Sequence, residues 1–412
     1  MRNRSNMGKD TTNSLIIAID IGSKAHFVYW CDVQGTEGKI ESITNTRKGF
    51  EKLCRIIETA KKKTGLSRVM VGYEPTGPYY LPLLHFLSEK PVKLVQVNPF
   101  HTRRTKEIVD NSPLKSDKKD PRVIALLMKF GFFMDVVIPR GSAAMLRNLS
   151  SIRERACGDR TAATNRLHDL LFCIFPEFET ILKLSTVTGR HLLQHYPTPQ
   201  SLLDLGKEQL TAIMQKVSKK QFGVDDAERL LDAAAHTVGI PEGIPARLFE
   251  LHHLLMTIKN LDTYIANVDK QMAAELKTMP ESKILLSIKG VGRVTAAYIL
   301  GEVVDFHAYP TQASILKMAG LTLYEVSSGD HRGSRHITRR GRALLRKALY
   351  LACLGMVKHN GIFYEPYQRL LHRGKIKSKA LVVLMRKLLR IMFSLVRNGV
   401  FYNHQRAFGK AA

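Results

Sequence analysis

Acidic side chains are scarce in this sequence of 412 residues. Asp and Glu together number 36 against 63 Lys and Arg, which leaves a formal net charge of +27. Such an excess creates an electric field that attracts polyanions and makes their binding depend on salt. The basic residues are spread over several segments rather than gathered in one terminal tail. The charge pattern therefore favours nucleic acid over an acidic membrane surface as the partner.

Paired cysteines and uninterrupted apolar runs are also missing. The five cysteines lie far apart with no CxxC pair, which argues against a disulfide framework or a zinc site and favours a reducing compartment. Asp20 interrupts the first apolar run, so we expect no signal peptide. Charged residues such as Arg386 and Arg390 interrupt the last run, so we expect no membrane span. These absences predict a cytoplasmic protein.

The hydrophobic pattern predicts three regions. Residues 15–135 alternate β-branched runs with amphipathic segments, which indicates a mixed α/β sheet with helices on its faces. The middle of the chain is mostly helical, and from residue 281 the sequence predicts a mainly α region. We expect the following parts: an α/β domain at 1–140, a helical region at 141–280 with a proline-bounded insert near 177–247, and a C-terminal domain at 281–412.

A heptad pattern marks the second of two long helices expected in the middle region. Apolar residues recur at alternating spacings of three and four, which is typical of a coiled coil. The sequence leaves open whether this helix pairs with the helix at 146–175 of the same chain or with its copy on another chain. The residues of the pattern are Leu251, Leu254, Ile258, Leu261, Ile265, Val268 and Met272.

A glycine-rich turn separates two predicted helices after residue 281. Lys289, Gly290 and Gly292 belong to "KGVG", where glycines allow close approach of a phosphate and the next helix directs free amides at the anion. This is the helix–hairpin–helix pattern for contact with a nucleic-acid backbone. An ordinary helical corner explains the turn equally well.

Four of the few acids fall where a metal site could form. Asp20 and Glu74 end predicted strands, and Asp117 and Asp120 precede a predicted helix. Carboxylate oxygens that converge at one edge of a sheet suit Mg²⁺ or Mn²⁺. Taken singly, Asp120 could be a helix cap and Asp20 a turn former. As a set in a polycation, the four favour metal-dependent phosphodiester chemistry.

The late segment "SSGDHRGSR" combines hydroxyls with positive charge. Ser327 or Ser328 could act as a nucleophile, and Arg332 and Arg335 could hold a phosphate. A solvated Ser-Gly loop is the alternative. His331 and His336 could assist proton transfer or contact phosphate. The basic run continues into a helix, where we expect phosphate contacts from Arg339, Arg340, Arg342, Arg346 and Lys347.

The order of motifs resembles the DEDD transposases of the insertion-sequence 110 family. "IDIGSK", "YEPTGPY", "VNPF" and "KSDKKD" are similar to its N-terminal RuvC/RNase H-like domain, and "GVGRVTAAYIL", "AGLTLYEVSSG" and "RGSRHITRRGRALLRKALY" to its second domain. The resemblance implies that Asp20, Glu74, Asp117 and Asp120 bind divalent metal. It also implies that Ser328 forms a covalent 5′-phosphoserine with DNA, and that a structured bridge RNA pairs with donor and target DNA.

Three functions are consistent with these features. The favoured one is a DNA transposase or recombinase that needs no ATP, since the sequence has no Walker A motif. It would act near the nucleoid as a homo-oligomer, a dimer or tetramer, with the serine and the acids contributed by one chain or by two. The second is a RuvC-like nuclease that uses metal-activated water. The third is a non-catalytic nucleic-acid scaffold.

Overall fold

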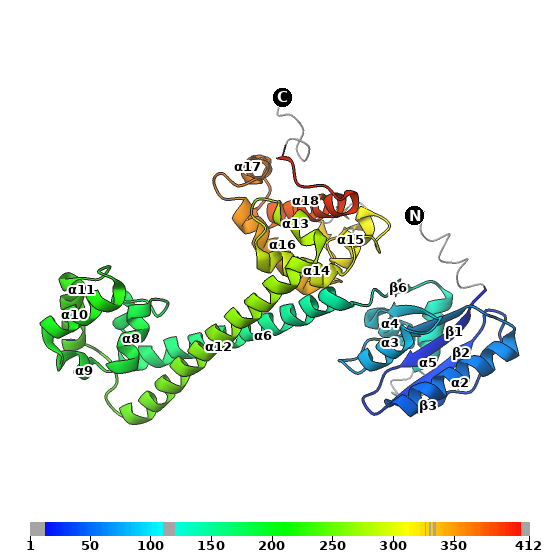
Figure 1. The fold of residues 1–412 in the computed structure, drawn as a ribbon, viewed down its shortest axis with the longest axis horizontal. Coiled ribbons are helices and arrows are strands. Elements are labelled where there is room, and N and C mark those ends of the chain that lie inside the picture. The colour runs from blue at the N-terminus through cyan, green and yellow to red at the C-terminus, as the bar shows by residue number, and fades with distance from the viewer. Residues whose placement is uncertain (1–12, 110–119, 326, 329–330, 333–334, 405–412) are drawn as a thin grey trace. The chain divides into compact units, whose positions relative to one another are not determined.

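The computed structural model describes residues 13–109, 120–325, 327–328, 331–332 and 335–404. Its internal contacts divide the chain into two compact units, Met1–Ile138 and Pro139–Ala412. Figure 1 shows that strands are concentrated in the first unit and helices in the second. The predicted mixed α/β N-terminal domain and helical C-terminal region are therefore confirmed.

The first unit is built on one mixed sheet of six strands in the order β3-β2-β1-β4-β5-β6. The β1·β4 and β4·β5 pairs are parallel, and the other three pairs are antiparallel. The parallel strands therefore direct their carboxyl ends to the same edge. The strands are β1 (Leu15–Asp20), β2 (Ala25–Cys31), β3 (Glu41–Thr44), β4 (Val69–Tyr73), β5 (Lys93–Val97) and β6 (Phe133–Asp135).

Helices cover both faces of this sheet. Strand β1 is buried on both sides because its residues alternate between two apolar clusters. One cluster packs under α2 (Arg47–Thr64) and α3 (Leu81–Leu87), and the other under α5 (Asp120–Lys129). Helix α4 (Pro99–Val109) contacts α5. The sheet is thus held rigidly between layers, which fixes the positions of its strand ends.

Two long helices form the frame of the second unit. Helices α6 (Gly141–Ile174) and α12 (Ile244–Thr278) pack against each other within one chain (Figure 1). Six of the seven heptad residues are buried, and Leu261 is half-buried. The structure thus answers the pairing question that the sequence left open. The coiled-coil geometry itself stays a prediction.

A separate apolar core lies where the end of α6 meets the start of α12. Leu167, Leu171 and Phe175 from the end of α6, and Leu251 and Ile258 from α12, pack with the short helices of the insert. The insert therefore packs on one end of the two long helices, in a core separate from that of the C-terminal helices. Its helices are α7 (Phe178–Ile181), α8 (Val187–His195), α9 (Pro199–Leu203), α10 (Gly206–Ser218) and α11 (Val224–Ala235).

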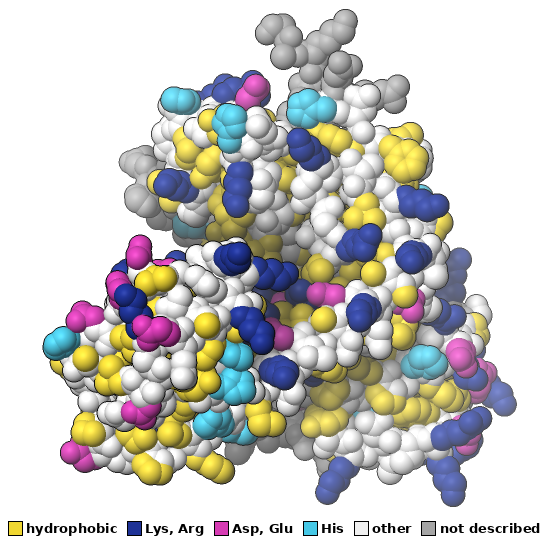
Figure 2. All heavy atoms as spheres, turned by 60° about the vertical axis from the view of Figure 1, so that its left-hand side comes forward, with side chains coloured by type: hydrophobic (Ala, Val, Ile, Leu, Met, Phe, Trp, Pro, Cys, Tyr) yellow, Lys and Arg dark blue, Asp and Glu magenta, His cyan; other side chains and the backbone are white. Residues whose placement is uncertain are grey.

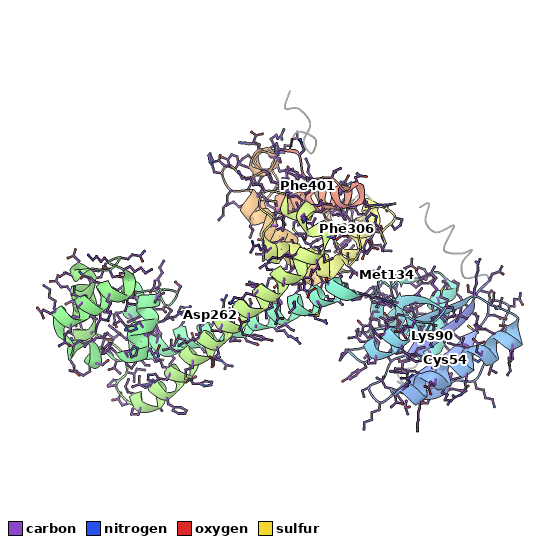
Figure 3. All side chains as sticks on the ribbon, viewed as in Figure 1. Cys54, Lys90, Met134, Asp262, Phe306 and Phe401 are labelled. Atoms are coloured by element: carbon purple, nitrogen blue, oxygen red, sulfur yellow. The ribbon has the colours of Figure 1, made fainter. Side chains whose placement is uncertain are left out.

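The opposite ends of the two long helices join a larger core. Leu146 and Met272 pack there with apolar residues of the C-terminal helices, and Phe306, labelled in Figure 3, is part of this core. The helices are α13 (Pro280–Leu286), α14 (Arg293–Val303), α15 (Gln312–Met318), α16 (Ala343–Met356), α17 (Tyr364–His372) and α18 (Lys377–Asn398).

Four two-residue strands lie between α15 and α16. β7 (Leu323–Tyr324) pairs with β10 (His336–Ile337), and β8 (Ser327–Ser328) pairs with β9 (His331–Arg332), both antiparallel. The cysteines are free thiols, with Cys31 and Cys353 buried. Within the described residues, no helix combines the length and the apolar character that crossing a bilayer requires.

Candidate active site

Asp20 and Glu74 occupy the carboxyl ends of two neighbouring parallel strands. Strands β1 and β4 are paired in register up to Ile19 opposite Tyr73. Asp20, the last residue of β1, and Glu74, directly after β4, are the next residues along the two chains, so they lie on neighbouring strand ends. Ligands of open α/β sheets bind at this edge. That the two acids share one site stays a prediction.

Glu74 lies half-buried among charged neighbours. Burial is the largest influence on its carboxyl group and raises its pKa above the usual value. A hydrogen bond with Thr102 and the ammonium of Lys106 act in the opposite direction, and the charge of Asp120 adds to the rise. One interacting group is therefore formed by Glu74, directly after β4, Thr102 and Lys106 on α4, and Asp120 on α5.

Asp120 is the first residue of α5 and forms a close ion pair. Its Oδ2 lies 2.6 Å from Lys106 Nζ, and the Asp120 side chain is only 13% exposed. The sequence placed Asp120 just before this helix, whereas the structure includes it as the first described residue of α5. Asp120 is held by its helix position and by Lys106 together, and it faces the Glu74 group.

The fourth predicted acid, Asp117, lies outside the described residues. Among the residues that the structure does describe, no group of three His, Cys, Asp or Glu side chains is arranged to hold a metal ion. The described part of the site is therefore the ion pair of Asp120 and Lys106, which acts electrostatically on Glu74, with Asp20 on the adjacent strand end.

The predicted nucleophile lies on a short β-hairpin. Ser328 is paired with His331, and Ser327 with Arg332, in the ladder of β8 and β9. The ladder of β7 and β10 flanks it on both sides, with Tyr324 opposite His336. The described residues of this segment, for which a solvated loop was the alternative interpretation, thus form two antiparallel ladders.

Ion pairs engage several arginines for which we predicted phosphate contacts. Arg335 Nε lies 2.8 Å from Glu325 Oε2, at the base of the hairpin. Arg342 Nε lies 3.8 Å from Oε2 of the buried Glu302. Arg346 Nη1 donates a hydrogen bond to the carbonyl of Ala319 at 3.0 Å.

Other basic residues are exposed. Lys289, Arg339 and Arg340 are exposed, whereas Lys347 forms an ion pair with Glu154 of α6. Arg332 lies on β9. Figure 2 shows Lys and Arg side chains scattered over the face that is turned forward, with apolar atoms between them. The basic side chains on this face are thus scattered rather than gathered in one patch.

The turn between α13 and α14 has the two glycines in different roles. Gly290 has φ 99°, and a Cβ there would lie 2.7 Å from Met356 Cγ. Gly292 precedes α14 as its N-cap with φ −86°, and a Cβ there would meet open space. Gly290 is therefore required by the fold, whereas nothing in the fold itself requires Gly292.

Sequence reasoning missed Thr102 and Lys106. Both belong to α4, which we did not predict because its sequence, "PFHTRRTKEIV", is polar and lacks apolar periodicity. Lys106 is one of 63 basic residues, so its type carried no signal. A weak signal was its position between "VNPF" and "KSDKKD", two of the motifs that carry the family resemblance.

Comparison with known proteins shows which family this chain resembles along its length. Residues 17–176 match the transposase family model DEDD_Tnp_IS110, and residues 282–368 match the model of transposases of the IS116/IS110/IS902 family. The 43.6 kDa protein of insertion element IS110 from Streptomyces coelicolor is 25% identical over 96% of this chain and 97% of its own length.

Two further relatives are similar to this chain. The 44.8 kDa protein of insertion element IS116 from Streptomyces clavuligerus is 25% identical over 93% of this chain and 94% of its own length. A pilin gene-inverting protein of Moraxella bovis is 26% identical over 34% of this chain and 45% of its own. With both family models matched in order and relatives aligned along nearly its whole length, the chain is a transposase of the IS110 family.

Proposed function

We propose that this transposase cuts and rejoins DNA through a covalent link between Ser328 and a DNA 5′-phosphate, with divalent metal held by Asp20, Glu74, Asp117 and Asp120. The observation that carries the metal part is the register of β1 and β4, which brings Asp20 and Glu74 to one edge beside Asp120. The strand order β3-β2-β1-β4-β5 supports a RuvC/RNase H-like domain.

The donor set fits a hard divalent cation. The carboxylate of Asp120 already pairs with one positive charge, the Lys106 ammonium, which also acts on Glu74, and carboxylate oxygens are the ligands that Mg²⁺ and Mn²⁺ prefer. A bound metal ion would supply positive charge for the oxygens that attack and leave during phosphodiester exchange. Asp20, Glu74 and Asp120 would hold it from the sheet edge, and Asp117 would complete the set.

Ser328 would cut and rejoin a DNA strand in two steps. Its Oγ attacks the phosphorus and forms an Oγ–P bond, while the P–O3′ bond breaks and the 3′ oxygen takes up a proton. The hydroxyl proton of Ser328 passes to a base, for which His331 is the candidate because it is paired with Ser328 in the ladder of β8 and β9. A 3′-hydroxyl of another strand then attacks the phosphoserine and restores the serine.

We extend the proposal to the partners. The turn of Lys289, Gly290 and Gly292 would contact a DNA backbone, because the helix that follows begins with free amides. Arg332, Arg335, Arg339 and Arg340 would hold phosphates near the serine. A bridge RNA would supply sequence specificity by base pairing, and two or four chains would assemble the serine and the acids around one phosphate.

The test is a search for the covalent adduct. Purified chain with Mn²⁺ and end-labelled DNA carrying the element's own ends, with RNA from the same flank, should give protein-linked DNA on a denaturing gel. Ser328→Ala should lose the adduct while it still binds DNA, and Ser327→Ala should keep it. Glu74→Gln should also lose it.

Two outcomes would contradict this proposal. Cleavage that survives Ser328→Ala and leaves no protein on the DNA would identify a nuclease that uses water. An undiminished adduct in Ser328→Ala, with loss of the adduct in Ser327→Ala, would identify Ser327 as the nucleophile. The RNA part is tested separately: sequencing of RNA that copurifies from the host should yield one discrete transcript from the element's flank, and its absence would refute RNA guidance.

A further inference from the structure

The ammonium group of Lys106 is paired with one carboxylate and acts on a second. Lys106 Nζ is 2.6 Å from Asp120 Oδ2, and both groups act electrostatically on Glu74. The lysine is 36% exposed and comes from α4, whereas Glu74 directly follows β4 and Asp120 belongs to the start of α5. One positive charge from a third element therefore acts on two negative charges at the sheet edge.

This arrangement has a direct electrostatic consequence. Two neighbouring carboxylates repel each other, and one ammonium group reduces that repulsion by pairing with Asp120 and by acting electrostatically on Glu74. A divalent cation on the same carboxylates would repel an ammonium group that remained in contact with them. The lysine and the metal ion thus compete for the same oxygens.

We propose that Lys106 is an internal counter-cation, which holds Glu74 and Asp120 together until a divalent cation displaces its ammonium group from Asp120. This rests on the proposed role of the acids as metal ligands. It assigns to Lys106 a positioning role: the site stays assembled without metal, at the cost of weaker metal binding. A DNA phosphate at the site adds negative charge, so DNA would favour the metal-loaded form.

The experiment measures metal binding directly, without activity. Mn²⁺ is titrated calorimetrically into the full-length wild-type chain and into Lys106→Met. We expect Lys106→Met to bind Mn²⁺ on the order of tenfold more tightly, because it removes a like charge next to the bound cation. Without metal, the same variant should unfold at a lower temperature than wild type, and saturating Mn²⁺ should abolish the difference.

Two controls separate charge from packing. Lys106→Arg keeps the positive charge and should bind Mn²⁺ as wild type does. Lys93→Met breaks an ion pair elsewhere in the same unit, where Lys93 Nζ lies 3.5 Å from Asp135 Oδ1, and should leave Mn²⁺ affinity unchanged.

The failures of the two proposals are distinguishable. If wild type binds Mn²⁺, Glu74→Gln does not, and Lys106→Met binds equally or more weakly than wild type, only the competition by Lys106 is refuted. If neither wild type nor Lys106→Met binds Mn²⁺, the carboxylate metal site and the competition both fall. If Lys106→Met binds Mn²⁺ and the wild type does not, the result would support both the carboxylate metal site and the competition by Lys106.

Discussion

Arg153 on α6 and Asp269 on α12 are joined by two hydrogen bonds, from Nε to Oδ1 at 2.6 Å and from Nη2 to Oδ2 at 3.3 Å. The same guanidinium lies 3.5 Å from the hydroxyl of Tyr298 on α14. The side chains are partly buried, 21% exposed for Arg153 and 35% for Asp269. A bidentate pair of this kind fixes orientation as well as distance, so it sets how α12 lies on α6.

Asp269→Ala should lower the free energy of unfolding of the second unit by about 1–2 kcal/mol, because it leaves the half-buried guanidinium without its partner. The exposed Glu250, also on α12, provides the control: Glu250→Ala should change stability by less than about 0.5 kcal/mol. Urea unfolding followed by circular dichroism measures both. Equal effects in the two variants would show that the pair contributes nothing.

Asp262, seven residues earlier on the same helix and labelled in Figure 3, connects three elements. Its carboxylate accepts hydrogen bonds from Arg160 of α6 and Arg190 of α8, each at 2.9 Å. Although partial burial acts to raise its pKa, these hydrogen bonds hold the pKa below the usual value.

Asp262→Asn should loosen the insert because two guanidinium groups lose their charged partner. The expected readout is faster limited proteolysis within residues 177–247 at neutral pH, with little change in cleavage after residue 281. The wild-type protein should show the same acceleration only at acidic pH. A carboxyl group with a depressed folded-state pKa stabilises the fold above its unfolded pKa and loses that effect as the pH falls through the folded value.

Gly290 and Gly292 should respond differently to the same substitution. Gly290→Ala introduces a Cβ at φ 99° and 2.7 Å from Met356 Cγ, which should destabilise the C-terminal region by about 1–3 kcal/mol. Gly292→Ala meets open space and should leave the melting temperature nearly unchanged. If the turn binds a DNA backbone, however, Gly292→Ala should weaken binding of duplex DNA several-fold. Unchanged DNA affinity in this variant would argue for an ordinary corner.

His26 gives the first unit a dependence on pH. It is fully buried on β2, its Nδ1 accepts a hydrogen bond from the Gly22 amide at 3.3 Å, and burial lowers its pKa from 6.5. The unfolded chain therefore binds a proton at a pH where the folded chain does not, so stability falls as the pH drops below about 6.5. His26→Gln should remove this slope, whereas substitution of the exposed His85 should keep it. Thermal melts between pH 5 and pH 8 would measure the difference.

Much of the first unit could be predicted because its strands are apolar and its helices periodic. The convergence of Asp20 and Glu74 followed from parallel strand ends alone. The edge strands β3 and β6 are only four and three residues long, and β7 to β10 have two residues each. Segments this short carry no alternation that a pattern could reveal.

The environment of the acids could not be predicted for a different reason. Lys106 forms an ion pair with Asp120, fourteen positions away in the sequence, and acts electrostatically on Glu74, thirty-two positions away. No local propensity encodes interactions over such separations. The pairing of α6 with α12 was open for the same reason: a heptad pattern states that a helix needs a partner, and it does not state which chain provides it.

The length of α6 has a consequence of its own. A helix of 34 residues spans about 50 Å, which corresponds to roughly fifteen base pairs of duplex DNA at 3.4 Å each. Because the insert and the C-terminal helices have separate cores at the two ends of the long helices, the length of these helices sets the distance between the two cores. Removing a matched seven-residue period from both helices would shorten this distance by about 10 Å, and both cores would keep their residues. The separation of the insert from the C-terminal helices is thus set by the lengths of α6 and α12.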